Sequence, residues 1–321
     1  MTQQAYAQRL NGDTAWLFSL PYEKHGAPTH FNLVVDPWLN EAPQVDMSFA
    51  FSIQKRVCKA AASSLKEVDD LLANRESESQ EKQQVDAVLL SHPFTDHAHP
   101  ESLTDPGTRK DIPLLGTTDA LSSVRKLPGL PFKDIYSIPV ASEKTPPWDD
   151  ASFHLAPIPA SIRIVRLLAK EKFAAIRHGP AWMQLHGAVA IMWLRQGTSW
   201  DEHSDYGAIL YSPHGITPLS VPSWLLRAEP RVLLHSLDRQ VLPSWLAGPV
   251  ALGFKNAVLM CQPGSFRPNL LLGTHDERKT AGGIVARLIR REPFDDSMQA
   301  QLSGTSSSLR VLEVGETIEL K

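Results

Sequence analysis

The sequence predicts an α+β fold in which sheet packs against sheet and helices lie outside. Short apolar segments of strand length outnumber helical patterns, and they occur in clusters rather than in regular alternation with helices. The 25 prolines indicate many loops and turns. Because no repeat or strong linker divides the 321 residues, we expect one domain over residues 1–321, with helical or loop insertions near residues 52–84 and 161–186.

Strand patterns dominate the first third of the chain. Residues 8–20 alternate around Asn11-Gly12-Asp13, a favourable hairpin turn. The next strand ends at Asp36-Pro37, a pair that stops a strand and fixes the turn after it. Helical spacing is present at residues 52–72, and Asp119 is a plausible N-cap for a helix over 120–125. The other strands expected here are residues 31–35, 85–90 and 112–115.

The rest of the chain predicts further strands and two helices. Residues 161–177 have a basic, amphipathic pattern that favours a helix, and residues 280–291 favour another. A strand pair around Gly315 is expected to close the chain over residues 308–320. The remaining expected strands are residues 153–158, 187–194, 207–211, 232–235, 257–260 and 270–272.

Charge, cysteine content and hydropathy exclude several classes of protein. The net charge of −3 gives no global electrostatic reason to bind nucleic acid or an anionic membrane. Two distant cysteines, Cys58 and Cys261, exclude a disulfide framework and a cysteine-based zinc finger. There is no signal-peptide pattern and no apolar run of about 18 residues, so we expect a cytoplasmic protein that does not span a membrane.

The most informative segment is residues 85–103, where a buried strand is followed by a run of possible metal ligands. His92, Asp96, His97 and His99 all lie within eight residues of the chain. Imidazole and carboxylate are natural ligands of zinc, iron and manganese. Polar side chains at the end of a rigid strand are also well placed to form a site. The sequence therefore predicts a metal site here, with His99 as a possible additional ligand.

This segment resembles the metallo-β-lactamase fold superfamily. The stretch His92-Pro93-Phe94-Thr95-Asp96-His97 is similar to the family's His-x-His-x-Asp-His motif. Three other segments resemble landmarks of the family and occur in the same order along the chain. They are Asp36-Pro37 before the motif, and residues 208–215 (AILYSPHG) and 271–277 (LLGTHDE) after it. The resemblance extends over residues 8–291. The resemblance implies a four-layer αββα sandwich. The general arrangement of the chain is similar to the branch that includes lactonases acting on sugar phosphates.

The chain departs from the family's ligand pattern at three places. Phe94 replaces the second histidine, Ser161 or Ile162 stands where a third is usual, and His214 replaces the bridging aspartate. This ligand count favours one divalent metal over two. The residues that the resemblance leaves to hold it are Asp96, His97, His214 and His275, with His92 nearby as a further ligand.

Together with the resemblance, these residues predict a metal-dependent hydrolase of a small ester or lactone that carries an anionic group. A single divalent ion, zinc first and iron or manganese as alternatives, would lower the pKa of a bound water toward about 7 and so supply hydroxide. Asp96 and His92 are the catalytic candidates, His92 as a ligand or a proton shuttle. Asp36 is a candidate to orient a ligating histidine. The alternative is that Asp36 serves only in the turn before Pro37.

The sequence also fits two other functions. Loss of the family histidines also fits a non-catalytic binding or sensor protein on the same fold. The altered ligand set also fits a metal enzyme of different chemistry, such as a decarboxylase or an iron-dependent oxygenase. The expected partner is a small molecule and not a nucleic acid, and the sequence fixes neither that molecule nor the oligomeric state.

Overall fold

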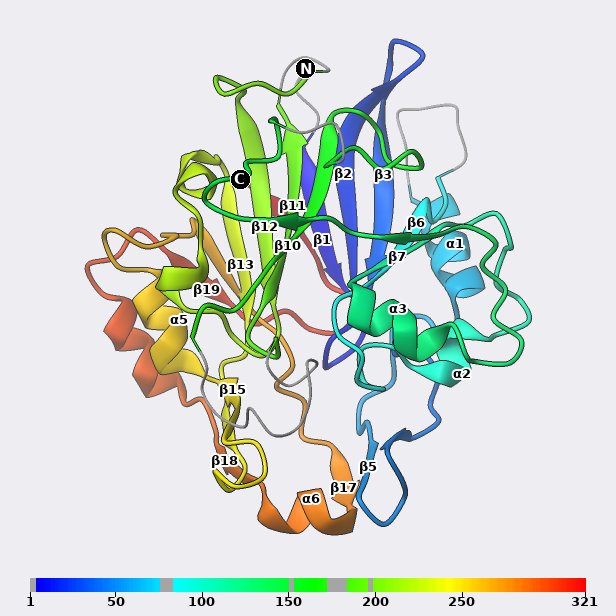
Figure 1. The fold of residues 1–321 in the computed structure, drawn as a ribbon, viewed down its shortest axis with the longest axis vertical. Coiled ribbons are helices and arrows are strands. Elements are labelled where there is room, and N and C mark those ends of the chain that lie inside the picture. Colours follow the sequence, from blue (N-terminus) through cyan, green and yellow to red (C-terminus); the bar gives the residue numbers. More distant parts are fainter. Residues whose placement is uncertain (1–3, 76–82, 150–152, 172–183, 196–198) are drawn as a thin grey trace.

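Two seven-stranded sheets form the body of the protein (Figure 1). The computed structural model describes residues 4–75, 83–149, 153–171, 184–195 and 199–321. The strand order is β20-β1-β2-β3-β6-β7-β8 in the first sheet and β19-β16-β13-β12-β11-β10-β9 in the second. Two smaller sheets, β15-β14-β18 and β17-β5-β4, have three strands each. The fold is therefore a mixed α/β fold with several sheets.

The first large sheet begins with the predicted hairpin. Asn11 stabilises its turn, because the side-chain oxygen accepts hydrogen bonds from the backbone N–H groups of Asp13 (2.8 Å) and Ala15 (2.9 Å). β2 then pairs antiparallel with β3, and β3 pairs parallel with β6. The strands of this sheet are β1 (Ala5–Arg9), β2 (Trp16–Lys24), β3 (Ala27–Val35), β6 (Ala87–Leu90), β7 (Leu114–Gly116), β8 (Ile135–Ser137) and β20 (Thr317–Leu320).

The second large sheet comes from the C-terminal half of the chain. Its strands are β9 (Val140–Ala141), β10 (Ile162–Leu167), β11 (Ala188–Leu194), β12 (Tyr206–Ser212), β13 (Arg231–His235), β16 (Leu270–Gly273) and β19 (Ser308–Arg310). The small sheets consist of β4 (Gln44–Asp46), β5 (Ser52–Lys55) and β17 (Thr280–Gly282), and of β14 (Arg239–Val241), β15 (Pro249–Leu252) and β18 (Arg290–Glu292). The helices are α1 (Leu65–Ala73), α2 (Pro100–Leu103), α3 (Thr118–Val124), α5 (Phe254–Met260) and α6 (Gly283–Leu288), with 3-10 turns η2 (Pro218–Ser220), η3 (Ser223–Arg227) and η4 (Asp296–Leu302).

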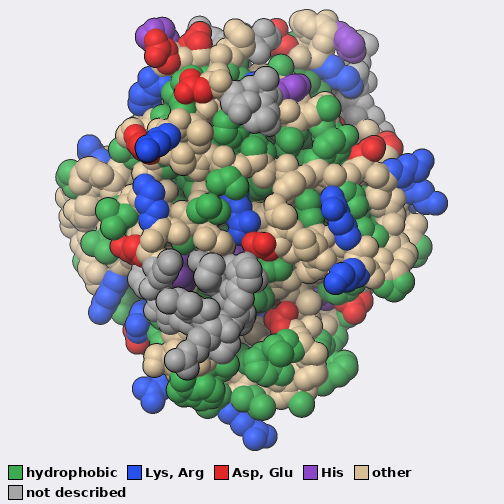
Figure 2. Space-filling view, in the orientation of Figure 1, with side chains coloured by type: hydrophobic (Ala, Val, Ile, Leu, Met, Phe, Trp, Pro, Cys, Tyr) green, Lys and Arg blue, Asp and Glu red, His purple; other side chains and the backbone are tan. Residues whose placement is uncertain are grey.

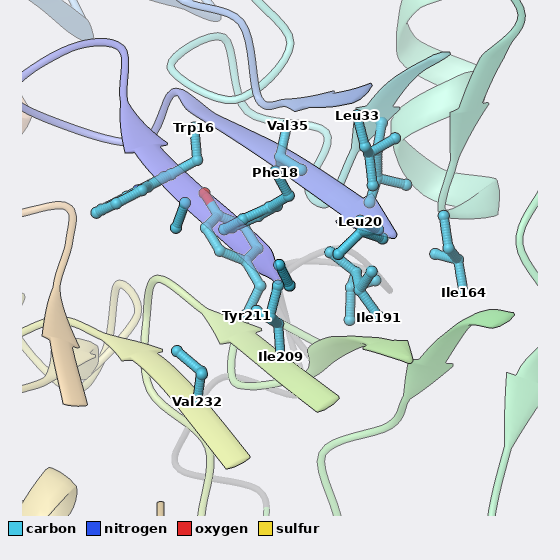
Figure 3. Packing of buried hydrophobic residues seen from close by; sticks show 14 of the residues in the cluster. Trp16, Phe18, Leu20, Leu33, Val35, Ile164, Ile191, Ile209, Tyr211 and Val232 are labelled. Carbon is cyan, nitrogen blue, oxygen red and sulfur yellow. The ribbon is translucent and has the colours of Figure 1, made fainter. Parts of the chain in front are cut away.

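Side chains of both large sheets meet in one buried cluster (Figure 3). Because side chains alternate along a strand, Trp16, Phe18 and Leu20 of β2 all point to the same side. They pack there with Ile209 and Tyr211 of β12, from the other sheet. Burial of these large apolar side chains is the main force that holds the two sheets together.

Two further apolar clusters combine each large sheet with helices. Leu17 of β2 and Val88 of β6 are buried with Leu65 and Val68 of α1. On the second sheet, strands β10 to β12 share a cluster with α5, to which Phe254 contributes. Figure 1 shows α1, α2 and α3 beside the first sheet and α5 beside the second. The helices thus cover sheet surface that does not face the other sheet.

Several predicted elements are wrong in type. Residues 161–177 were expected to be helical, but Ile162–Leu167 form β10 of the second sheet, and residues 172–177 lie outside the described ranges. The alternation of Ile162 and Ile164 with Arg163 is a strand pattern, and both isoleucines enter the core between the sheets. Residues 257–260 were expected to be a strand but belong to α5, whose buried residues Phe254, Ala257 and Met260 follow helical spacing.

Other predictions differ in their boundaries. The expected helix over residues 52–72 divides into β5 and the shorter α1, and the one over 280–291 divides into β17, α6 and β18. Residues 153–158 contain no strand. Thr117, not Asp119, caps α3, since its hydroxyl accepts from the Ala120 N–H at 3.4 Å. Residues 308–320 do hold two strands, but β19 joins the second sheet and β20 the first.

The surface mixes charges of both signs. On the face drawn in Figure 2, lysine and arginine side chains lie scattered among aspartate and glutamate. Within the described ranges, no helix combines the length and apolar character needed to cross a membrane.

Asp86, just before β6, makes the stability of the fold depend on pH. Its Oδ2 accepts from the Asn32 N–H at 2.7 Å, and burial raises its pKa to about 6. The unfolded chain, with an aspartate pKa of about 3.9, releases this proton first, so stability falls as pH rises from about 4 to 6. We expect Asp86→Asn to be more stable than the wild type by about 2 kcal/mol at pH 7.5, with little gain near pH 4. Urea unfolding at both pH values measures this, and an equal gain at both would contradict it.

Candidate metal centre

Strand ends from both large sheets bring the predicted ligands together. His92, Asp96 and His97 follow β6 of the first sheet. His214 follows β12, and His275 follows β16, both in the second sheet. All five side chains are buried. His92, His214 and His275 each lie two residues beyond the end of a buried strand, whereas Asp96 and His97 lie in the turn after β6, where the His97 N–H donates to the Phe94 carbonyl oxygen at 3.0 Å.

The side chains form two overlapping groups of possible metal ligands. One group is His92, His97 and His214, and the other is Asp96, His97 and His275. In each group, the ligand atoms all lie within 4.8 Å of one another. His97 belongs to both groups, and its Nε2 lies 3.0 Å from Nε2 of His214. The geometry thus makes His97 the centre of the site.

Asp36 fixes the orientation of His97. Its Oδ2 accepts from Nδ1 of His97 at 2.7 Å, from the Ser91 hydroxyl at 2.5 Å and from the Tyr211 hydroxyl at 2.8 Å. Its Oδ1 accepts from the Ser91 N–H at 2.7 Å. The Asp36 backbone has a φ of 47°, in the left-handed region that few non-glycine residues adopt. Asp36 is thus a buried acceptor of four hydrogen bonds, one of which sets the tautomer of His97.

The other histidines are anchored in the same way. Nδ1 of His275 lies 3.2 Å from Oδ1 of Asp13, and Nδ1 of His214 lies 3.1 Å from the Val250 carbonyl oxygen. Nδ1 of His92 lies 2.7 Å from the Ser91 hydroxyl, which already donates to Asp36 and so accepts here. With Nδ1 anchored, the rings of His214 and His275 present Nε2 for coordination, which is the usual arrangement of metal-binding histidines. Nε2 of His92 instead lies 3.1 Å from the Leu185 carbonyl oxygen.

The histidine rings of the site differ in the direction in which their surroundings shift the pKa. Burial lowers the pKa of His92 and of His214 well below the ordinary value, and the neighbouring histidines add to this effect. Burial also disfavours the charged form of His97, but the carboxylates of Asp96 and Asp36 outweigh it and raise its pKa. His92 and His214 are therefore neutral at pH 7, which is the form that binds a metal ion.

A lysine–aspartate pair completes the site and was missed by the sequence analysis. The Lys279 ammonium lies 2.5 Å from Oδ2 of Asp13 and 3.5 Å from Oδ2 of Asp96. Despite its burial, the pKa of Asp13 is lowered by Lys279 and His275, and the two aspartates raise that of Lys279. Asp13 was interpreted as a turn residue only. The one available signal for Lys279 was its place four residues after His275.

Three residues singled out in the sequence stand apart from the two ligand groups. His99 stacks on Trp38 at 5.5 Å between ring centroids, and burial lowers its pKa to about 3. The Phe94 ring lies 6.2 Å from that of His214, so it forms an apolar wall beside the histidines. Ser161 precedes β10 and is in neither group of described ligands.

Comparisons with known proteins add no family assignment. No protein-family profile matches the chain, and a search of curated proteins finds no similar sequence. The site's donor set of imidazoles and one carboxylate, buried and held by hydrogen bonds at the opposite ring nitrogen, fits a divalent ion of the zinc, iron or manganese type.

Proposed function

We propose that the protein is a metal-dependent hydrolase of a small ester or lactone that carries an anionic group. One observation carries the proposal: four buried imidazoles have Nδ1 hydrogen-bonded outward. Nε2 of His97, His214 and His275 is left for a shared centre at His97, whereas Nε2 of His92 lies 3.1 Å from the Leu185 carbonyl oxygen. A divalent ion bound there would act as a Lewis acid and lower the pKa of water toward about 7.

His92, His97 and His214 are the residues that we propose to hold the ion. A catalytic zinc site typically has three protein ligands and one open position, and this group supplies three imidazoles. Asp96 is less available to a metal because Lys279 lies 3.5 Å from its carboxylate. Nε2 of His92 also lies 3.1 Å from the Leu185 carbonyl oxygen, so His92 is the ligand whose bond to the ion would need a small shift. Zinc is the ion expected first, with iron or manganese as alternatives.

The remaining side chains would serve the substrate. Asp96 lies 3.7 Å from Nε2 of His97 and 3.5 Å from Nε2 of His275, so its carboxylate can accept a proton at the centre of the site. Phe94 would exclude water from one side. The positive charge of the ion would favour a substrate with a carboxylate or a phosphate, whereas the charge of Lys279 is already neutralised by Asp13 and Asp96.

Membership of the metallo-β-lactamase superfamily is part of the same proposal. It is supported by the ligand pattern after β6 and by the two large sheets that share one core. The four-layer αββα arrangement is supported by the two outer clusters, in which helices cover the sheets. The cytoplasmic location stays a prediction from the sequence.

Activity assays after metal exchange test this function. The protein would be stripped with a chelator, reloaded with Zn²⁺, Fe²⁺ or Mn²⁺, and assayed on esters and lactones with and without an anionic group. We expect hydrolysis that needs the ion and falls about 100-fold or more in His214→Ala. His203→Ala is the matched control, since that ring is 85% exposed, and it should keep full activity. Equal hydrolysis by the stripped and reloaded protein would contradict the proposal.

A further inference from the structure

The second group of possible ligands already contains a cation. The Lys279 ammonium lies 2.5 Å from Asp13 and 3.5 Å from Asp96, and its side chain is only 7% exposed. It also lies 5.3 Å from the centre of the Trp38 ring, a favourable place for a positive charge. The ammonium thus has two carboxylates and an aromatic face around it.

The same carboxylates border the place where a second metal ion would bind. Asp96 shares its Oδ2 between Lys279 and Nε2 of His275, both at 3.5 Å. Asp13 shares its two oxygens between Lys279 and Nδ1 of His275. A divalent ion on Asp96 and His275 would therefore lie beside a buried positive charge, where repulsion is strong because little water screens it.

The other ligand group has no such competitor within hydrogen-bonding reach. This group consists of His92, His97 and His214. The hydrogen-bonding partners of their ring nitrogens are Asp36, Ser91, two carbonyl oxygens and, between His97 and His214, each other's Nε2. The Asp96 carboxylate lies slightly further away, at 3.7 Å from Nε2 of His97. No lysine or arginine is among these partners in the described part of the chain. The two halves of the site thus differ in the charge that they already hold.

We propose that the Lys279 ammonium acts as the resident cation of the Asp13–Asp96–His275 half, and so restricts the centre to a single divalent ion at His92, His97 and His214. This inference rests on the proposed metal binding. It assigns Lys279 as the residue that determines metal number, a positioning role rather than a catalytic one. It also explains how the carboxylates Asp13 and Asp96 can stay buried and ionised without a second metal.

Removal of the ammonium should open the second half of the site to a metal ion. Equilibrium dialysis against Zn²⁺ followed by elemental analysis would compare the wild type with Lys279→Met, which keeps most of the side-chain length and loses the charge. We expect one equivalent in the wild type and two in Lys279→Met. Lys279→Arg, the matched control, keeps the charge and should bind one. Adding Asp96→Asn to Lys279→Met should return the count to one.

The outcomes separate this inference from the proposed function. No zinc in the wild type would overturn the proposed metal site itself. One equivalent in both the wild type and Lys279→Met, or two in the wild type, would leave metal binding in place and overturn the role of Lys279. If Lys279→Met does not fold, the double variant Asp13→Asn/Lys279→Met removes both members of the ion pair while Asp96 and His275 remain. The same count of two is expected for it, and one equivalent would overturn the inference.

Discussion

Replacement of Asp36 by alanine is expected to lower the free energy of unfolding by about 4 kcal/mol and to weaken zinc binding about 10–100-fold. The carboxylate is fully buried and accepts from His97, Tyr211 and both donors of Ser91. Without it, these donors lose their partner in a place that water does not reach. His97 also loses the bond that sets its tautomer, so its Nε2 no longer points reliably into the site.

Urea unfolding and zinc titration of the same variant measure both effects. Tyr211→Phe is the matched control, since it removes only one of the four donors to Asp36 and should cost about 1 kcal/mol. We expect Asp36→Asn to fall between the two, because the amide keeps one acceptor. An Asp36→Ala protein that unfolds within about 1 kcal/mol of the wild type and binds zinc equally well would contradict the role given to this carboxylate.

Replacement of His97 by glutamine is expected to reduce hydrolysis about 1,000-fold or more, the largest effect on activity of any single change in the site. His97 is the one residue common to both ligand groups, and its Nε2 is 3.0 Å from that of His214. Loss of this ring therefore removes a ligand from the metal, whichever of the two groups binds it.

His99→Gln supplies the control for this prediction. Its ring is just as buried as that of His97, lies two residues further along the chain, and stacks on Trp38 outside both ligand groups. Steady-state rates on the best ester or lactone substrate should therefore fall in His97→Gln and stay near the wild-type value in His99→Gln. Equal losses in the two variants would show that burial of the histidines matters, not their place in the site.

The part of the site that the sequence predicts best is the part that is contiguous. His92, Asp96 and His97 follow one buried strand, so a strand pattern and a ligand pattern side by side are enough to identify them. His214 and His275 are indicated by the resemblance, because each follows an apolar strand at one of its landmarks. By contrast, Lys279 and Asp13 meet only through tertiary packing, and neither lies in a pattern that predicts a charged partner.

Secondary structure is likewise predicted well where local interactions determine it and poorly where pairing with other strands determines it. The hairpin around Asn11 depends on local hydrogen bonds and is predicted well. The segment Ile162–Leu167 has apolar residues at spacings that suit a helix or a strand, and its position between β9 and β11 makes it a strand. Pairing with distant strands thus overrides local preference there, which one sequence does not reveal.

His97 is the residue that we propose to organise a centre for one divalent ion. Elemental analysis of wild-type protein and His97→Gln, both dialysed against excess Zn²⁺ and then against metal-free buffer, tests it most directly. We expect one equivalent of zinc in the wild type and none in His97→Gln, with both proteins folded. Wild-type protein without bound metal, or His97→Gln with the same metal content as the wild type, would contradict it.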